Sequence, residues 1–291
     1  MSRPVPYLAN AKATSEVLRK HGFHLKKRYG QNFIIDPHVT DKIIQAAEVG
    51  EDDLIIEIGP GIGTLTQYLA FHAAEVVTVE IDRSLIPVLE DTLSGYENVT
   101  VLCADILKTD LEGIINEHGA GRHVKIVANL PYYITTPIIM SLFEQGLDFE
   151  SATVMMQKEV GLRCCASAGT DEYGALSLAV AYYAEAEVAA NVPPNCFMPR
   201  PDVSSIVLKL VRRTVRPAVS DENLLFGVIK AAFGKRRKTL YNCLRSSGLK
   251  NFEDLKWKEI IVSAGLDENV RGEALSLDDF IRLTDEINES D

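Results

Sequence analysis

Short apolar runs rich in β-branched residues alternate with helix-like stretches over the first two thirds of the chain. Such runs, about four to eight residues long, are typical of buried strands. The expected strands are Leu54–Ile58, Val76–Glu80, Val99–Cys103, Val124–Ala128 and Ala152–Met156. The expected helices are Thr64–His72, Arg83–Leu93, Asp110–His118 and Pro137–Gln145. This alternation predicts an α/β fold whose sheet is mostly parallel.

The pattern changes towards the C-terminus. Leu176–Val188 and Ser204–Val211 are apolar runs that would add two edge strands and bring the sheet to seven. Beyond residue 216 the apolar stretches have the length of helices, joined by polar links. These helices are expected at Leu224–Phe233, Thr239–Leu244, Trp257–Ala264 and Leu277–Ile287. We therefore predict a domain at 1–215, with a basic extension at 1–30, and a small helical domain at 216–291.

Composition narrows the class of protein. The 291 residues are 46% hydrophobic, enough for a packed core, and no apolar run reaches the roughly 18 residues of a membrane span. The N-terminus lacks an apolar signal core. The five cysteines form no C-x-x-C pair, so neither a metal site nor a disulfide framework is expected. We expect a reduced, cytoplasmic protein.

A glycine-rich turn follows the first predicted strand, with Gly59, Gly61 and Gly63 spaced G-x-G-x-G. Glycines here are compatible with a tight strand-to-helix turn, and also with a backbone that approaches a ligand closely. The dinucleotide fingerprint G-x-G-x-x-G would need a glycine at position 64, where this chain has Thr64. The Gly-Lys-Ser/Thr of a triphosphate-binding loop is also absent from the sequence. Glu80 ends the next strand, where a carboxylate can accept both hydroxyls of a ribose.

Two further acids fit the same ligand. Glu57 precedes the glycines, as is typical of S-adenosylmethionine sites, and Asp105 closes the third predicted strand. An aspartate there can accept a hydrogen bond from the adenine amine of the cofactor. Together with Glu80, these residues predict a methyltransferase that uses S-adenosylmethionine.

The tetrapeptide 129–132, Asn-Leu-Pro-Tyr, follows the fourth predicted strand. Asn and Pro are turn formers, so an ordinary turn is one interpretation. The alternative is chemical: an amide, a carbonyl and an aromatic face can converge on the exocyclic N6 of an adenine. Its position after Gly59, Glu80 and Asp105 favours the second interpretation.

With these motifs in order, the chain resembles the KsgA-type rRNA adenine N6,N6-dimethyltransferases, which modify small-subunit (16S) rRNA. The resemblance runs from about Lys26 to the C-terminus. It rests on GQNF (30–33), EIGPGIGTLT (57–66), VEID (79–82), AD (104–105), NLPYYITTPI (129–138), CFMPRPDVSS (196–205), AFGKRRKTLYNCL (232–244) and RGEALSLDDF (271–280). It implies a Rossmann-like class I methyltransferase domain and a helical C-terminal domain that binds rRNA.

The resemblance also implies site residues. The cofactor site would comprise Gln31, Asn32, Ile34, Glu57, Gly59, Gly61, Gly63, Glu80, Ile81, Asp105, Ile106 and Asn129. The adenine pocket would comprise Asn129, Leu130, Pro131, Tyr132 and Phe197. In this hypothesis the Asn129 side-chain oxygen and the Leu130 carbonyl accept from the adenine amine, and Tyr132 stacks on the base.

Net charge is −11, but charge is unevenly distributed. Residues 203–250 hold eleven Lys/Arg and two acids, a local balance of +9, whereas 251–291 hold four Lys/Arg and twelve acids. A basic run can be a solvated helical face, or it can contact phosphate. We predict RNA contact for two groups: Lys26, Lys27 and Arg28, and the run Lys235, Arg236, Arg237 and Lys238, which we expect to open a helix.

The predicted partner is small-subunit rRNA within a pre-30S-like particle, bound by a monomer without membrane or metal. Three other functions compete. A large-subunit rRNA dimethylase of the antibiotic-resistance type shares the first half of the chain. A DNA adenine methyltransferase usually carries a second proline at the position of Leu130. A mainly non-catalytic ribosome assembly factor would not need Glu80 and Asn129, although both roles can coexist.

Overall fold

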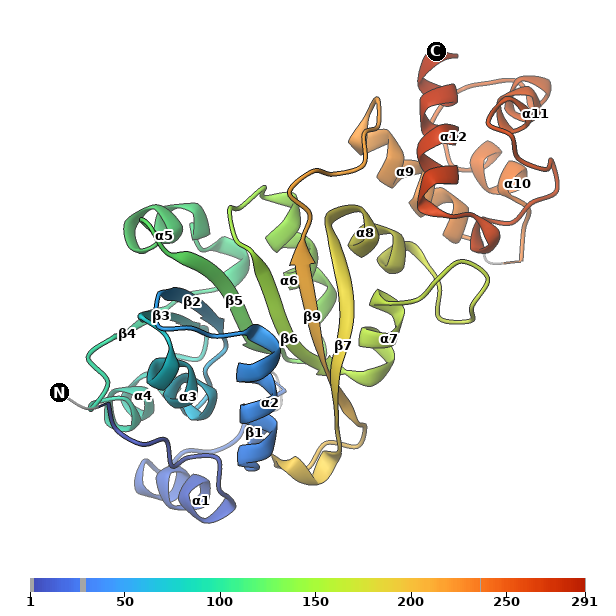
Figure 1. Ribbon diagram of the computed structural model, residues 1–291. Helices are drawn as coiled ribbons and strands as arrows, with labels where there is room; N and C mark the ends of the chain where they lie inside the picture. The colour runs from blue at the N-terminus through green and yellow to red at the C-terminus, as the bar shows by residue number, and fades with distance from the viewer. Residues whose placement is uncertain (1–2, 27–29, 236, 291) are drawn as a thin grey trace. The chain divides into compact units, whose positions relative to one another are not determined.

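The computed structural model describes residues 3–26, 30–235 and 237–290 (Figure 1). The chain forms two compact units. The first comprises Met1–Gly161 and Glu185–Arg212, and the second comprises Leu162–Ala184 and Arg213–Asp291. The sequence pattern put the boundary at residue 215 and assigned 162–184 to the first domain. Membership of a unit depends on long-range contacts, which local hydrophobic patterns do not reveal.

A seven-stranded sheet with the order β4-β3-β2-β5-β6-β9-β7 organises the first unit. Its strands are β2 (Asp53–Ile58), β3 (Glu75–Glu80), β4 (Val99–Cys103), β5 (His123–Asn129), β6 (Ser151–Gln157), β7 (Ala184–Val192) and β9 (Ser205–Arg212). Neighbours from β4 to β6 pair in parallel, and β9 runs antiparallel to β6. The predicted mostly parallel α/β fold is confirmed. All six residues of β2 are buried, as expected where both sheet faces are covered.

Helices connect the parallel strands (Figure 1). Those that lie between consecutive strands from β2 to β6 are α3 (Thr64–His72), α4 (Ile86–Thr92), α5 (Leu111–His118) and α6 (Thr135–Glu144). In the chain, α1 (Ala11–Lys20) and α2 (Pro37–Ala47) precede β2, and α7 (Lys158–Cys164) follows β6. Single 3₁₀ turns lie at η2 (Arg83–Leu85), η3 (Ile106–Lys108) and η4 (Pro194–Cys196). Among the residues that the structure describes, no helix has the length and apolarity needed to cross a membrane.

The sequence analysis placed no element before residue 54, yet α1 and α2 lie there. Their N-caps are ordinary ones: the Asn10 side chain accepts from the amides of Lys12 and Ala13, and the Asp36 side chain accepts from that of His38. Pro37 occupies the first position of α2, where its missing N–H costs nothing. Both starts therefore have recognisable signals in the sequence.

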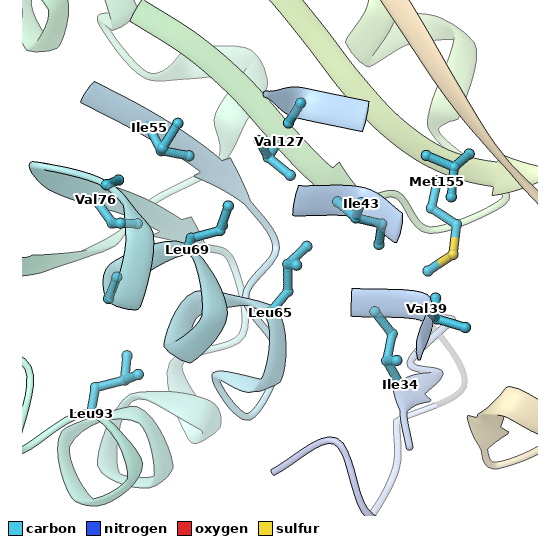
Figure 2. Close-up of a cluster of buried hydrophobic side chains, with 14 of the residues drawn as sticks. Ile34, Val39, Ile43, Ile55, Leu65, Leu69, Val76, Leu93, Val127 and Met155 are labelled. Atoms are coloured by element: carbon cyan, nitrogen blue, oxygen red, sulfur yellow. The ribbon is translucent and has the colours of Figure 1, made fainter. Parts of the chain in front are cut away.

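One core cluster fixes α2 and α3 on the sheet. Ile43 of α2 and Leu69 of α3 pack with Ile55, Val127 and Met155, which come from β2, β5 and β6 (Figure 2). All five side chains are at most 1% exposed. Because the helices pack over adjacent parallel strands, the loops at the carboxyl ends of those strands are held on a rigid base.

A two-stranded antiparallel sheet forms beside this core. β1 (Phe33–Ile34) pairs with β8 (Phe197–Met198), with Ile34 opposite Phe197. Neither strand was predicted, because two residues are too few for a periodic pattern. The pairing ties the segment after residue 30 to the loop that follows β7.

The second unit is helical. Its elements are α8 (Ala175–Tyr183), α9 (Glu222–Phe233), α10 (Leu240–Arg245), α11 (Asp254–Ser263), η5 (Gly272–Ala274) and α12 (Leu277–Glu289). α9 packs with α8, α10 and α12, and Trp257 and Phe280 are fully buried. The four predicted helices after residue 216 are all present, although α11 begins three residues earlier than expected and α12 ends two residues later.

The expectation of a strand over Leu176–Val188 was wrong for its first half. Residues 175–183 form α8, and the strand β7 begins at Ala184. Residues 176–183 are apolar on nearly every side, so neither a period of 2 nor one of 3.6 is visible in this half, whereas residues 184–188 alternate as a strand does. Alanine and leucine favour a helix, and packing on α9 buries it.

Candidate methyl-transfer site

A cleft lies where the carboxyl ends of β2, β3 and β5 meet. The chain runs from β2 outwards to β3 and β4, then returns to β5 on the other side of β2. Ligands bind at such a reversal in open parallel sheets. The cleft has about 790 Å³ of empty space, including space open to solvent. Its walls comprise Gly30, Gln31, Asn32, Phe33, Ile34, Glu57, Gly59, Pro60, Gly61, Thr64, Leu65, Glu80, Ile81, Leu85, Asn129, Leu130, Pro131, Tyr132 and Tyr133.

The glycine loop between β2 and α3 forms the floor. Gly59, Gly61 and Gly63 all have positive φ, of 70°, 61° and 88°. Residues with a Cβ rarely adopt this conformation, so the loop requires glycine at these positions. A Cβ on Gly59 would meet no atom within 4 Å. The backbone at Gly59 is therefore open to close approach by a ligand.

The Glu80 carboxylate stands at the end of β3 and is 5% exposed. Its Oε1 accepts from the amide of Asp82 at 2.7 Å, and its Oε2 accepts from the amide of Gly61 at 3.3 Å. Burial nevertheless raises the pKa of Glu80 to about 7, and the nearby Asp82 charge adds to the rise. These two donors do not fully replace the water lost, so the carboxylate can accept further hydrogen bonds.

Glu57 lies beneath the glycine loop, fully buried in β2. Burial raises its pKa to about 8, and a bond from the Thr66 hydroxyl at 2.6 Å opposes that rise. Thr64 stands on the cleft wall, and its buried hydroxyl has no partner among the residues described. A buried polar atom without a partner costs free energy, so a ligand atom at Thr64 would relieve that cost.

Asn129 and Leu130 form the opposite wall, directly after β5. The Asn129 side-chain amide donates to the backbone carbonyl of Asn32 at 3.1 Å. A carbonyl can accept but not donate, so this bond leaves the side-chain oxygen of Asn129 as an acceptor. The Leu130 amide donates to the carbonyl of Met155 at 2.9 Å, whereas no residue in the described ranges donates to the Leu130 carbonyl. Two acceptors therefore stand next to each other in the chain at the cleft.

Tyr132 completes this wall, and its side chain is half-buried. Its hydroxyl shares a 2.6 Å hydrogen bond with the hydroxyl of Ser205, a fully buried residue at the start of β9. The ring is thus attached at its far end to the sheet. Pro131 precedes it and supplies no N–H that would compete for nearby acceptors.

The cleft brings together nine of the twelve predicted cofactor residues and four of the five predicted adenine residues. The exceptions are Gly63, Asp105, Ile106 and Phe197. Gly63 is the N-cap of α3 and directly precedes Thr64, which lines the cleft. Asp105 caps η3, where its side chain accepts from the amide of Leu107 and lies 3.7 Å from Lys108. Ile106 belongs to the same turn.

Phe197 lies in β8 opposite Ile34, 3% exposed, and its ring is part of the core cluster with Val207. It is absent from the cleft wall, so its contact with a base stays a prediction. Sequence reasoning missed seven wall residues: Gly30, Phe33, Pro60, Thr64, Leu65, Leu85 and Tyr133. Five of them adjoin predicted site residues, and Leu65 lies two residues beyond Gly63. Nothing in the local sequence distinguishes Leu85.

The predicted RNA-binding residues fall in different settings. Lys26 forms an ion pair with Asp82 at 2.7 Å, so a carboxylate of the protein itself neutralises its charge. Lys27, Arg28 and Arg236 lie outside the described residues. Lys235, Arg237 and Lys238 are exposed, and the Lys235 ammonium donates to Ser246. Lys235, Arg237 and Lys238 lie in the turn between α9 and α10, not at the start of a helix, because Thr239 caps α10.

A mostly parallel seven-stranded sheet, a glycine loop after its first strand and a carboxylate at the end of the next define a class I methyltransferase. The family model for ribosomal RNA adenine dimethylases matches residues 22–289, and the chain belongs to that family.

Individual relatives agree with this assignment. The chain is 53% identical over 285 residues to a protein of Lachnoclostridium phytofermentans named ribosomal RNA small subunit methyltransferase A, covering 97% of this chain and 98% of that protein. A Streptococcus pneumoniae protein of the same name is 50% identical over 282 residues, covering 96% and 97%. A solved dimethyladenosine transferase from Plasmodium falciparum has a TM-score of 0.75 at 26% identity, covering 89% and 98%.

Proposed function

We propose that this protein transfers methyl groups from S-adenosylmethionine to N6 of two adjacent adenosines near the 3′ end of small-subunit (16S) rRNA, giving N6,N6-dimethyladenosines. One observation carries the proposal: Asn129 and Tyr132 share a single cleft with Glu80 and the glycine loop. A cofactor and a planar amine can therefore be held next to each other. The names of the curated relatives support the choice of the small subunit.

The cleft fits the cofactor on three grounds. Gly59 leaves open space where a side chain would stand, Thr64 has a buried hydroxyl without a partner, and the Glu80 carboxylate has acceptor capacity left. Glu80 would accept from the ribose hydroxyls, and Gly59 would let the backbone approach. Bound S-adenosylmethionine would supply an electrophilic methyl group on its sulfonium.

The chain's own task is to activate and orient the nucleophile. The N6 lone pair of adenine is delocalised into the ring, so the amine is a weak nucleophile. The Asn129 side-chain oxygen and the Leu130 carbonyl would accept its two hydrogens and favour a pyramidal nitrogen. The Tyr132 ring, attached to Ser205, would stack on the base and fix its plane. Positioning of this kind supplies a large share of the acceleration in such transfers.

The proton can leave to water after transfer, so the reaction needs no carboxylate base and no Lewis acid. We propose that the protein acts as a monomer without a metal, on rRNA within a pre-30S-like particle. We also propose that the enzyme acts in the cytoplasm, where such particles would be its substrate. For the second methylation, the monomethylated amine would rotate so that its remaining hydrogen faces one of the two acceptors.

The exposed cations Arg237 and Lys238 would contact rRNA phosphates in this proposal. They lie in the stretch 203–250, whose local balance is +9. Neither forms an ion pair with any acid in the described part of the chain. Lys26 is not included among these contacts, because its ammonium pairs with Asp82.

One experiment tests the proposal against its competitors. The protein is incubated with labelled S-adenosylmethionine and, separately, unmethylated small subunits, large-subunit rRNA and adenine-containing DNA. We expect label on two adjacent small-subunit adenosines, and none with Asn129→Ala. Label on large-subunit rRNA or on DNA would identify a different substrate, and full labelling by Asn129→Ala would refute the assigned acceptor.

A further inference from the structure

Asp82 lies two residues beyond Glu80 and is almost completely buried, with 1% of its surface exposed. Its Oδ1 accepts from the Lys26 ammonium at 2.7 Å and from the Ser84 hydroxyl at 2.7 Å, and its Oδ2 accepts from the Gln31 side-chain amide at 3.0 Å. Its own amide donates to Glu80 Oε1 at 2.7 Å. Asp82 is absent from the cleft wall, so these bonds do not serve a ligand directly.

The segment 30–34, here called the strap, lines the cleft with all five of its residues. Besides the backbone pairing of β1 with β8, two hydrogen bonds attach the strap to opposite sides of the cleft. Gln31 bonds to Asp82 on the Glu80 side, and the Asn32 carbonyl accepts from the Asn129 amide on the opposite side. The Gln31 side-chain oxygen also accepts from the Lys26 amide at 3.0 Å. A chain of hydrogen bonds therefore runs from Glu80 through Asp82, Gln31 and the strap backbone to Asn129.

We propose that Asp82 is a positioning residue that aligns the two halves of the site: through its amide it orients the Glu80 carboxylate, and through Gln31 and Lys26 it holds the strap that orients the Asn129 amide. The assignment rests on the proposed function, because Glu80 and Asn129 have their roles from it. Asp82 itself touches neither the cofactor nor the base.

The charge of Asp82 is essential to this arrangement. Burial opposes ionisation, yet the bonds from Lys26 and Ser84 hold the pKa of Asp82 below its usual value, so the group is ionised at neutral pH. In Asp82→Asn, an NH2 group would replace one of the two acceptor oxygens. Placed at Oδ2, it would face the Gln31 amide, donor against donor. Gln31 cannot turn over without losing its bond from Lys26.

Two measurements test the role in the intact protein. Calorimetry with S-adenosylhomocysteine gives the cofactor affinity, and hydrogen–deuterium exchange without cofactor reports on the strap. For Asp82→Asn we expect a Kd at least tenfold higher and faster exchange in peptides that cover 30–34. In turnover assays, KM for S-adenosylmethionine should rise about tenfold while KM for rRNA stays within twofold, which a general loss of folded protein would not produce.

Asp91→Asn is the matched control. Asp91 also accepts from a lysine of the N-terminal segment, Lys20, at 2.7 Å, but it lies on α4 away from the cleft wall. The Asp91→Asn variant should have the cofactor Kd of the wild type and the same hydrogen–deuterium exchange over residues 30–34. If Asp82→Asn behaves as Asp91→Asn does in both measurements, the proposal is wrong. If the wild type binds no S-adenosylhomocysteine, the proposed function fails, while the exchange of free protein still tests the attachment of the strap.

A double-mutant cycle tests whether Lys26 acts on the cofactor site through Asp82. Lys26→Met removes the ammonium and keeps the apolar stem of the side chain. If Lys26 acts through Asp82, Lys26→Met should weaken cofactor binding in the wild type and change it less than twofold when Asp82→Asn is already present. Equal effects in both backgrounds would show that Lys26 and Asp82 act independently, and would refute the coupled arrangement.

Discussion

Burial raises the pKa of the Glu80 carboxyl to about 7, although backbone amides, among them those of Gly61 and Asp82, donate to it. A ribose hydroxyl donates best to an ionised carboxylate, since a protonated carboxyl loses part of its acceptor capacity. In the proposed role, the deprotonated form of Glu80 is therefore the one that would bind the cofactor. With a pKa of about 7 in the free protein, that form is a minority at pH 6 and the majority at pH 8.

Cofactor affinity should consequently rise with pH through about 7. Each pH unit below the Glu80 pKa reduces the ionised fraction about tenfold, and a pKa unit corresponds to about 1.4 kcal/mol. We expect the Kd for S-adenosylhomocysteine to be roughly tenfold higher at pH 6 than at pH 8, measured by calorimetry. Glu80→Gln should bind weakly at both pH values. A wild-type affinity that is flat across this range would contradict the role of Glu80.

Tyr132 offers a test that separates its ring from its hydroxyl. Tyr132→Ala removes the stacking surface, worth roughly 1–3 kcal/mol per base, so kcat/KM should fall about 5- to 150-fold. Tyr132→Phe keeps the ring and loses the bond to Ser205, so we expect a loss within about fivefold. Ser205→Ala breaks the same bond and should match Tyr132→Phe. A severe loss in Tyr132→Phe alone would assign the hydroxyl a direct part in the reaction.

At the scale of elements, the loop from β2 to α3 has little tolerance for a side chain. A Cβ on Gly61 would lie 3.0 Å from the Phe33 ring of the strap, and φ at this position is +61°. Gly61→Ala should destabilise the protein by about 1–2 kcal/mol from backbone strain, with the contact adding to it. It should also raise the cofactor Kd, because the Gly61 amide donates to Glu80. Denaturant unfolding and calorimetry give the two quantities.

Gly121→Ala is the control for backbone strain alone. Gly121 has φ of +74° in the turn before β5, and a Cβ there would meet no atom within 4 Å. It should lose similar stability and keep the wild-type Kd. If the two variants bind cofactor equally well, the loop at Gly61 does not contribute to the site beyond its fold.

The elements that the sequence predicted well are those with a period or an apolar run of sufficient length. β2, β3, β4 and their helices belong to this group, and so does the placement of Glu80 at a strand end. The two-residue strand β1 has no readable period, and its register comes from pairing with β8. That pairing and the core packing bury the Phe197 ring, and its contact with a base stays a prediction.

The bond from Gln31 to Asp82 crosses 51 residues, and that from Asn129 to Asn32 crosses 97. No local pattern encodes such partners. The sequence therefore indicated which residue types gather at the cleft, through motifs whose chemistry is recognisable. The fold determines which of these residues support the others, as the difference between the buried Asp82 and the partly exposed Asp91 illustrates.

At the scale of the whole molecule, the chain has an acidic average and a basic region in its second half. Phosphate responds to local potential, so the average of −11 does not prevent rRNA binding. The turn between α9 and α10 presents Arg237 and Lys238 to solvent. The cofactor cleft lies in the first unit and this turn in the second. Recognition of rRNA and methyl transfer should therefore be separable by mutation.

Arg237→Glu combined with Lys238→Glu tests that separation. If both cations contact phosphate, rRNA affinity should fall and the slope of log K against log salt should become shallower by about 1–2, since each released counterion contributes about 0.7–0.9. Cofactor affinity should stay within twofold of the wild type. The measurement is binding of unmethylated small subunits between 50 and 200 mM salt, a range over which counterion release is readily resolved.

The matched control makes the same change in net charge elsewhere in the second unit. Lys256→Glu with Lys258→Glu alters α11, in the stretch 251–291 that holds twelve acids. Lys258 already lies 3.6 Å from Glu268, so phosphate contact is not expected there. The control should retain the wild-type salt slope. Equal slopes for the two double variants would mean that net charge, and not the turn between α9 and α10, governs the attraction to rRNA.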